Sequence, residues 1–345
     1  KLAFIADYHR NNDDCCGEVI ATGPINTATG AVTTNASSAA LPTPRGTDTR
    51  ELAQNLTTRT KETGYGFSLQ ADIQAGTQTV TSITAYRNYK NTEIRDGDFL
   101  PAAYIGFNQL HDFGPQTGDT FSQEIRLTSP GHQFLTYVLG AYYSRAASER
   151  IFTRNDQVCT SAVTPAPTAL TPCSSASANP STFPTGTADF GSVFKNVALF
   201  GQGTLNISER FRVIGGLRYT VDQLDVFHSR ATTLAGPGIN ANFDQGVYNE
   251  YIRLVALGVS PTTAASQAVS ASNGVPFRAK ATNENLSGKA GVQYDISHGS
   301  TAYATYARGY KGPAFNVFYN LTATGTNVIA PETSDSYEIG LKNTL

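Results

Sequence analysis

Apolar and polar residues alternate along several segments of about ten residues each. In one of these segments, Leu217, Tyr219 and Val221 alternate with Arg218 and Thr220. A period of two places the two sets on opposite faces of a β-strand. This pattern, with weaker versions of it elsewhere, predicts ten strands. They are expected at about residues 1–9, 63–75, 78–90, 120–129, 133–148, 194–207, 211–228, 285–297, 300–311 and 334–345.

The connections between these strands alternate in length without exception. Short turns that contain Gly or Ser follow four of the strands and are typical of hairpins. Long polar segments follow the others, and a compact soluble domain should not contain five structureless loops of this length. The long segments are expected at about 10–62, 91–119, 149–193, 229–284 and 312–333.

This rhythm of short and long connections predicts the fold class. A transmembrane β-barrel has short periplasmic turns and long extracellular loops, and its strands alternate between residues that face lipid and residues that face the lumen. We therefore expect an all-β fold, an antiparallel transmembrane β-barrel to which this chain contributes about ten strands. A secreted β-sandwich or β-helix is the alternative, and it would explain the alternation but not the rhythm of the connections.

The composition of the chain argues against a domain that binds nucleic acid. Charged residues make up 15% of the chain, and 25 basic against 27 acidic residues give a net charge of −2. This balance excludes a basic nucleic-acid-binding domain, so no nucleic acid partner is expected. No run of about 18 apolar residues occurs, so no transmembrane helix is expected either. The 17 Tyr and 18 Phe residues can supply aromatic girdles, although Trp is absent.

The four cysteines are not spaced as metal ligands. Their even number suits an oxidising, extracytoplasmic compartment. Cys159 and Cys173 lie in one long loop with several Pro between them, and a disulfide is predicted there. Cys15 and Cys16 are adjacent and could form only a vicinal bridge or pair elsewhere. Four unrelated free thiols are the alternative.

No catalytic constellation is found, since Ser, His and Asp occur without a nucleophile elbow. We expect neither enzymatic activity nor a cofactor. Asp96-Gly97-Asp98 could begin a calcium loop, but the remaining ligand spacing does not follow, so a solvated turn is expected and no metal site. A haem or metal site would use His111, which lies near Tyr104 and Phe107 in sequence, but an exposed polar loop residue is expected there instead.

Two further features are charged residues on the predicted strands and one long segment with helical spacing. Arg126 and Arg218 share strand faces with Glu124 and Asp222, so these charges are expected to face the lumen, against a plug or in water. Residues 245–270 have near-helical apolar spacing, and a Pro within them could start a second short helix. This segment would be a lid over the mouth of the barrel or a self-packed loop cap.

Several segments resemble the barrel domain of TonB-dependent outer-membrane receptors. The strand motifs are FSQEIRLTS at 121–129, ALFGQ at 198–202, GGLRY at 215–219, YATYARGYKG at 303–312 and PETSDSYEIGLK at 331–342. They occur in the order that the family has. The resemblance implies a barrel of about 22 strands with a plugged lumen. Residues 1–345 would be the middle portion of that barrel, with the plug domain, the first strands and the C-terminal strands absent from this chain.

The resemblance also implies a function and partners. The protein would lie in the cell outer membrane among its lipids and take up a scarce large solute, which is a metal chelate or glycan such as a ferric siderophore, cobalamin or an oligosaccharide. Energy would come from TonB with ExbB and ExbD. A passive porin is one alternative, and a structural barrel subunit with lipoprotein or other outer-membrane partners is another. Ligand contacts are expected from loop residues on the rigid scaffold, namely Tyr104, Phe107, His111, Tyr310, Lys311, Phe315 and Tyr319.

Overall fold

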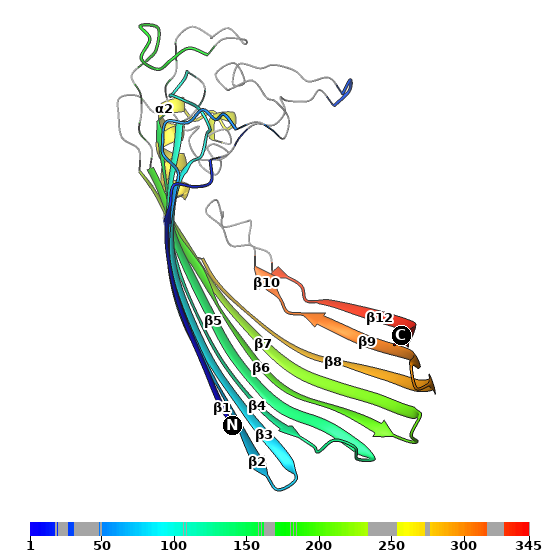
Figure 1. Ribbon diagram of the computed structural model, residues 1–345. Coiled ribbons are helices and arrows are strands. Elements are labelled where there is room, and N and C mark those ends of the chain that lie inside the picture. Colours follow the sequence, from blue (N-terminus) through cyan, green and yellow to red (C-terminus); the bar gives the residue numbers. More distant parts are fainter. Residues whose placement is uncertain are drawn as a thin grey trace.

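Ten strands of the chain form one antiparallel sheet in the computed structural model, in the order β1-β2-β3-β4-β5-β6-β7-β8-β9-β12 (Figure 1). Each strand pairs with the next one in sequence, as expected for a meander, except that β9 pairs with β12 across the separate pair β10 and β11. The structure describes residues 1–17, 19, 27–30, 48, 50–105, 107, 109–157, 159, 161, 170–179, 181, 183, 185–233, 254–272, 277–315 and 328–344. The predicted all-β, antiparallel fold class is confirmed.

The bounds of the strands match the predicted positions and extend beyond most of them. The first five are β1 (Leu2–Asp13), β2 (Arg59–Ala75), β3 (Gln78–Asp96), β4 (Gln109–Thr128) and β5 (Leu135–Gln157). The others in the sheet are β6 (Thr185–Asn206), β7 (Phe211–Thr233), β8 (Phe277–Ser297), β9 (Ser300–Lys311) and β12 (Glu332–Asn343). A separate pair, β10 (Ala314–Phe315) and β11 (Val328–Ile329), follows β9.

The short and long connections lie at opposite ends of the curved sheet (Figure 1). We call these the turn end and the loop end. The long connections are shorter than predicted, because the strands continue into them. Residues 91–96 and 109–119 belong to β3 and β4, and most of the predicted loop 91–119 is therefore strand. The predicted loop 149–193 is likewise strand up to Gln157 and again from Thr185.

One face of the sheet, here the outer face, carries exposed apolar side chains. On the central strands Leu199 is 62% exposed, Leu217 63% and Leu286 57%. The opposite, inner face carries the charges at the turn end and in the middle of the sheet. Arg126 pairs with Glu124 there, and Arg218 lies over the rings of Tyr142 and Phe200, at 5.5 and 5.7 Å. Apolar residues toward lipid and charges toward the lumen are the arrangement of a membrane-spanning barrel wall.

Aromatic rings line the edge of the apolar band that lies nearer the loop end. Phe121 and Tyr143 are 6.2 Å apart on the outer face, and Tyr306 and Tyr337 are 5.1 Å apart further along the sheet. Charged residues follow two positions closer to the loop end, for example Arg145 beyond Tyr143. The predicted supply of a girdle by Tyr and Phe is consistent with this row, because aromatic residues collect where hydrocarbon meets water.

The alternation inverts its phase on β7 above the girdle. Up to Val221 the apolar residues lie on the outer face. From Leu224 onward they lie on the inner face, where Leu224 and Val226 are only 7% and 5% exposed, while Gln223 and Asp225 point outward. Beyond the inversion, toward the loop end, β7 has apolar residues inside and polar residues outside, which is the arrangement of a water-soluble protein.

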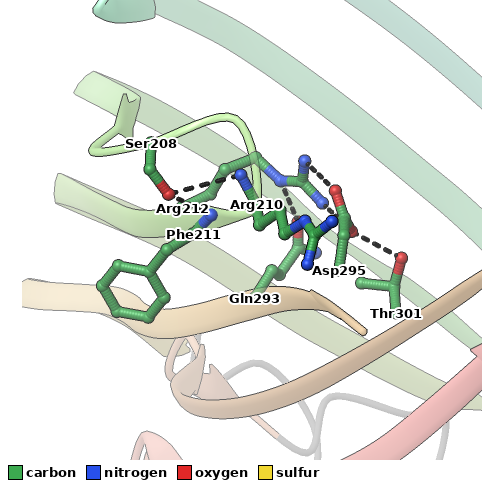
Figure 2. Close-up of polar contacts among 7 residues, drawn as sticks. All are labelled: Ser208, Arg210, Phe211, Arg212, Gln293, Asp295 and Thr301. Atoms are coloured by element: carbon green, nitrogen blue, oxygen red, sulfur yellow. Dashed lines mark hydrogen bonds and ion pairs between the residues drawn. The ribbon is translucent and has the colours of Figure 1, made fainter. Parts of the chain in front are cut away.

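Hydrogen bonds join three strands at the turn end (Figure 2). Arg212 on β7 donates to both carboxylate oxygens of Asp295 on β8, at 2.8 and 2.6 Å, and the Thr301 hydroxyl on β9 donates to the same carboxylate at 2.8 Å. Ser208 in the preceding turn accepts the backbone N–H of Phe211 at 3.0 Å. A bidentate Arg–carboxylate pair has a fixed geometry, so this network ties together the ends of the three strands.

A single described helix of more than one turn, α2 (Pro261–Ser272), lies at the loop end. It begins at the predicted Pro, and the Ser260 hydroxyl accepts the backbone N–H of Thr263 as a helix cap. The predicted second short helix is confirmed; residues 245–253 of the predicted helical segment lie outside the described residues. Within the described part of the chain, no helix has the length and apolar character needed to span a membrane.

Candidate functional site

A cavity of about 400 Å³ lies on the inner face of the sheet near the loop end. It is formed where the alternation of β6 and β7 turns apolar residues inward. Its lining residues come from four strands and from the segment after β9. They are Gln116, Ser148, Arg150, Phe190, Gly191, Ser192, Phe194, Leu224, Val226, Pro313, Ala314 and Phe315.

The lining combines aromatic rings with a compensated charge. Phe190, Phe194 and Phe315 supply three rings, and the two serines supply hydroxyls. Arg150 donates to Glu93 at 2.6 Å, so its charge is balanced within the wall. The guanidinium also lies 5.3 Å from the ring centroid of Phe152. Such a surface suits a ligand group that is flat and largely apolar, with a few hydrogen-bonding atoms at its edge.

Residues at and near the end of β9 position residues 313–315, which line one side of the cavity. Asn283 donates to the Tyr310 hydroxyl at 2.9 Å. Gly312 packs against Asp222 so closely that a Cβ there would lie 2.6 Å from a carboxylate oxygen. Asp222 is 2% exposed and accepts a hydrogen bond from Asn196 at 2.5 Å. A Cβ at position 312 would therefore displace the buried Asp222 carboxylate, and glycine allows this close approach.

The structure separates the predicted ligand residues. Phe315 lines the cavity, whereas Tyr310 is not among the lining residues and accepts a hydrogen bond from Asn283. Lys311 points to Glu332 at 3.7 Å, with both side chains largely exposed. Tyr319 lies outside the described residues. The predictions that these residues contact a ligand remain predictions.

Tyr104, Phe107 and His111 belong to a different part of the loop end. The backbone at Ile105 donates to Thr171 at 2.9 Å, and Cys173 donates to Ala103 at 3.0 Å. The loop of residues 97–108 therefore pairs with the loop that the Cys159–Cys173 disulfide closes, and this predicted disulfide is present. Cys15 and Cys16 form the vicinal bridge. The His111 ring interacts with the Asn55 side chain at 3.0 Å.

The prediction of a solvated turn at Asp96-Gly97-Asp98 was wrong. Asp96 is 1% exposed, and its carboxylate accepts the backbone N–H groups of Asn55, Leu56 and Phe99 at 2.9 to 3.3 Å. The side chain joins the loop before β2 to the loop after β3. Its oxygens are thus occupied by N–H donors. Among the residues that the structure describes, no cluster of three or more metal-ligating side chains is found.

Asp98 should make this loop sensitive to pH. Burial raises the pKa of Asp98 to about 6, against the N–H groups of Leu110 and Leu100 that favour the charged form. Because the folded loop binds the proton more tightly than the unfolded chain, its stability should be greatest at low pH and fall as the pH rises through about 6. Hydrogen exchange of the loop, corrected for intrinsic rates, should show more protection below that pH than above it. Asp98→Asn should remove this dependence, and protection that increases with pH would contradict the assignment.

Sequence reasoning missed most of the residues that line the cavity. Arg150, Phe190 and Ser192 fell within a predicted loop, although Ala188, Phe190, Ser192 and Phe194 recur with a period of two. That period was the available signal. The period was hard to recognise because the apolar residues of this segment face inward, whereas Val197 and Leu199, nearer the turn end of the same strand, face outward.

Comparisons with known proteins agree with this geometry. The family model described as "TonB dependent receptor-like, beta-barrel" matches residues 19–345. The ferric yersiniabactin uptake receptor FyuA from Yersinia pestis is similar in structure, with a TM-score of 0.53 and 14% identity over 84% of this chain and 34% of that one. The siderophore receptor PiuA from Acinetobacter baumannii has a TM-score of 0.56 and 13% identity over 99% of this chain and 44% of that one. The chain thus spans less than half the length of either. No curated protein sequence shows a significant match.

Proposed function

Because the chain belongs to the TonB-dependent receptor β-barrel family, we propose that it is part of a receptor that takes up a scarce, large solute with energy from TonB, ExbB and ExbD. The family is one of outer-membrane receptors. The cavity lined by Phe190, Phe194 and Phe315 is the observation that carries the proposal for this chain. It faces inward and lies at the loop end, where a solute arriving from outside the cell would first meet the wall.

The proposed solute is a ferric siderophore, with cobalamin and an oligosaccharide as further candidates. FyuA and PiuA are named for such ligands, which favours a metal chelate. A cavity of about 400 Å³ would take one arm of a chelate, and its rings suit a flat aromatic arm. Tyr104, Phe107, His111 and Tyr310 are proposed as contacts from the surrounding loops, with Lys311 and Tyr319.

The rest of the receptor is proposed to lie outside these residues. The ten strands would be completed to a barrel of about 22, and a plug domain with a TonB-binding segment would close the lumen. Inner-face charges such as Arg126 and Arg212 would then face that plug. This chain covers only 34% of FyuA and 44% of PiuA, which supports the proposal that further strands and a plug domain lie outside these residues.

Uptake of iron in cells that carry the full-length receptor tests the function. Uptake of a labelled ferric siderophore should stop when TonB or the proton gradient is removed, while binding at the cell surface persists. Phe315→Ala should weaken that binding about fivefold, because an aromatic contact is lost. Phe134→Ala removes an exposed ring at the turn end and should leave binding unchanged.

Two outcomes would favour the alternatives. Uptake that is indifferent to TonB and saturates only at high solute concentration would indicate a passive porin. Deletion without loss of uptake, together with stable lipoprotein partners, would indicate a structural barrel subunit.

A further inference from the structure

The Asp222 carboxylate is buried on the inner face of the sheet, next to the cavity. It is 2% exposed and lies opposite Asn196 in the register of β7 and β6. Two positions further toward the loop end, Leu224 lies opposite Phe194, and both of these residues line the cavity. Asp222 is not among the lining residues. It belongs to the layer of side chains that borders the cavity on its turn-end side.

The two oxygens of this carboxylate have different neighbours. Oδ1 accepts a hydrogen bond from the Asn196 side chain at 2.5 Å. Oδ2 lies over Gly312, where a Cβ would be only 2.6 Å away. The Tyr310 hydroxyl also lies close to the carboxylate. One buried side chain therefore contacts both the sheet and the segment that leads into residues 313–315 of the cavity lining.

The Asn196 side chain connects Asp222 to Arg218. Its amide nitrogen donates to Asp222, and its carbonyl oxygen accepts a hydrogen bond from the Arg218 guanidinium at 3.3 Å. The guanidinium is held further by the Thr220 hydroxyl at 3.1 Å and by two aromatic rings of the inner face. Because one end of the amide can only donate and the other can only accept, these two contacts fix its orientation. A cation on the inner face is thus linked through one amide to the carboxylate beside the cavity.

We propose that Asp222 is a positioning residue for the cavity, whose carboxylate holds the segment at Gly312 against the sheet and so places Phe315 in the lining. This inference rests on the proposed function, because it treats the cavity as the place where the solute binds. Arg218 takes part through Asn196. Without the guanidinium the amide would be free to turn, and its hydrogen bond to the carboxylate would weaken. A residue outside the cavity would in this way affect the binding of solute.

Hydrogen exchange of the full-length receptor in detergent, without solute, tests the positioning. The readout is a peptide that covers residues 309–315. Asp222→Asn keeps the shape of the side chain and removes its charge, so exchange in this peptide should be about tenfold faster, the effect of weakening a hydrogen bond to a charged group. Arg218→Gln should accelerate it about threefold, because it acts through a neutral amide. The double variant should exchange no faster than Asp222→Asn alone, since both changes act on one contact.

Arg126→Gln is the matched control, because Arg126 also lies on the inner face but pairs with Glu124 on its own strand. It should leave exchange in residues 309–315 unchanged. Equal exchange in wild type and Asp222→Asn would overturn the proposal, as would an additive effect in the double variant. An equal acceleration in peptides of β2 and β3 would also overturn it, because that result indicates a general loss of stability. A gel comparison of heated and unheated samples identifies variants that are folded, and Arg218→Gln alone carries the test if Asp222→Asn is not.

Binding measurements separate this inference from the proposed function. For the labelled ferric siderophore that the uptake experiment identifies, Asp222→Asn should raise the dissociation constant about fivefold, as expected when the aromatic contact of Phe315 is misplaced. Faster exchange with unchanged affinity would overturn the assignment of the cavity as the solute site. Unchanged exchange would overturn the positioning role, whichever solute the receptor takes up.

Discussion

Gly288→Val should clearly reduce the amount of protein that reaches its folded form. A Cβ at this position of β8 would lie 2.5 Å from the carbonyl oxygen of Gly216 and 2.8 Å from the Leu217 side chain. The first neighbour is backbone in the adjacent strand, so relief requires the two strands to separate. We expect a cost of about 3 kcal/mol, at the upper end of what forced overpacking produces. Loss of the heat-modifiable, fast-migrating band in unheated gel samples would report the effect.

Gly215→Val provides the matched control on the partner strand. Nothing lies within 4 Å of a Cβ at that position, and the residue is exposed on the outer face. The added side chain would meet lipid, so folding should be retained. If the two variants fold equally well, the close contact between β7 and β8 is not a constraint on the sheet.

Leu199→Arg should impair insertion into the membrane. Leu199 is 62% exposed on the outer face, within the apolar band. An arginine on the lipid face of a barrel costs about 2–4 kcal/mol near the bilayer midplane. Quantifying folded protein in the outer membrane fraction measures the loss.

Gln202→Arg, on the same strand, tests whether the face determines this result. Gln202 points to the inner face, where Arg126 and Arg218 already lie. A further arginine would there be in the lumen, so the amount of inserted protein should stay near that of wild type. A similar loss for both variants would contradict the assignment of the two faces.

The part of the fold that lies in the membrane could be predicted from sequence. Below the girdle, the outer face meets hydrocarbon and the inner face meets polar groups, so the alternation of Leu217, Tyr219 and Val221 with Arg218 and Thr220 is direct. All ten strands of the sheet were found in this way. The short turns followed because their Gly and Ser residues interrupt the pattern.

The part above the girdle could not be predicted as well, since both faces there meet protein or water. Leu224 and Val226 point inward, opposite in phase to Tyr219 and Val221. β6 shows the same inversion and was predicted too short, because Phe190 and Phe194 point inward whereas Val197 and Leu199 point outward. Several lining residues fell in segments predicted as loops, and of all the lining residues only Phe315 was predicted to contact a ligand.

The buried aspartate shows a second limit. Asp96 is surrounded by polar sequence and reads as exposed, but the N–H groups that bury it come partly from Asn55 and Leu56, about 40 positions away. The sequence around Asp96 does not indicate a contact with residues so far away in the chain. The pairing of the loop at residues 97–108 with the disulfide-closed loop was likewise not anticipated, although the disulfide itself was.

The long strands also have a mechanical meaning. β5 and β6 pair without interruption from Leu135 opposite Leu205 to Asn155 opposite Thr185. At about 3.3 Å per residue the two strands are more than twice as long as the hydrocarbon core is thick. A pull directed along such strands loads the whole ladder of hydrogen bonds together, whereas a pull across them would open the bonds in turn. A wall built in this way resists a pull along its strands far better than a pull across them.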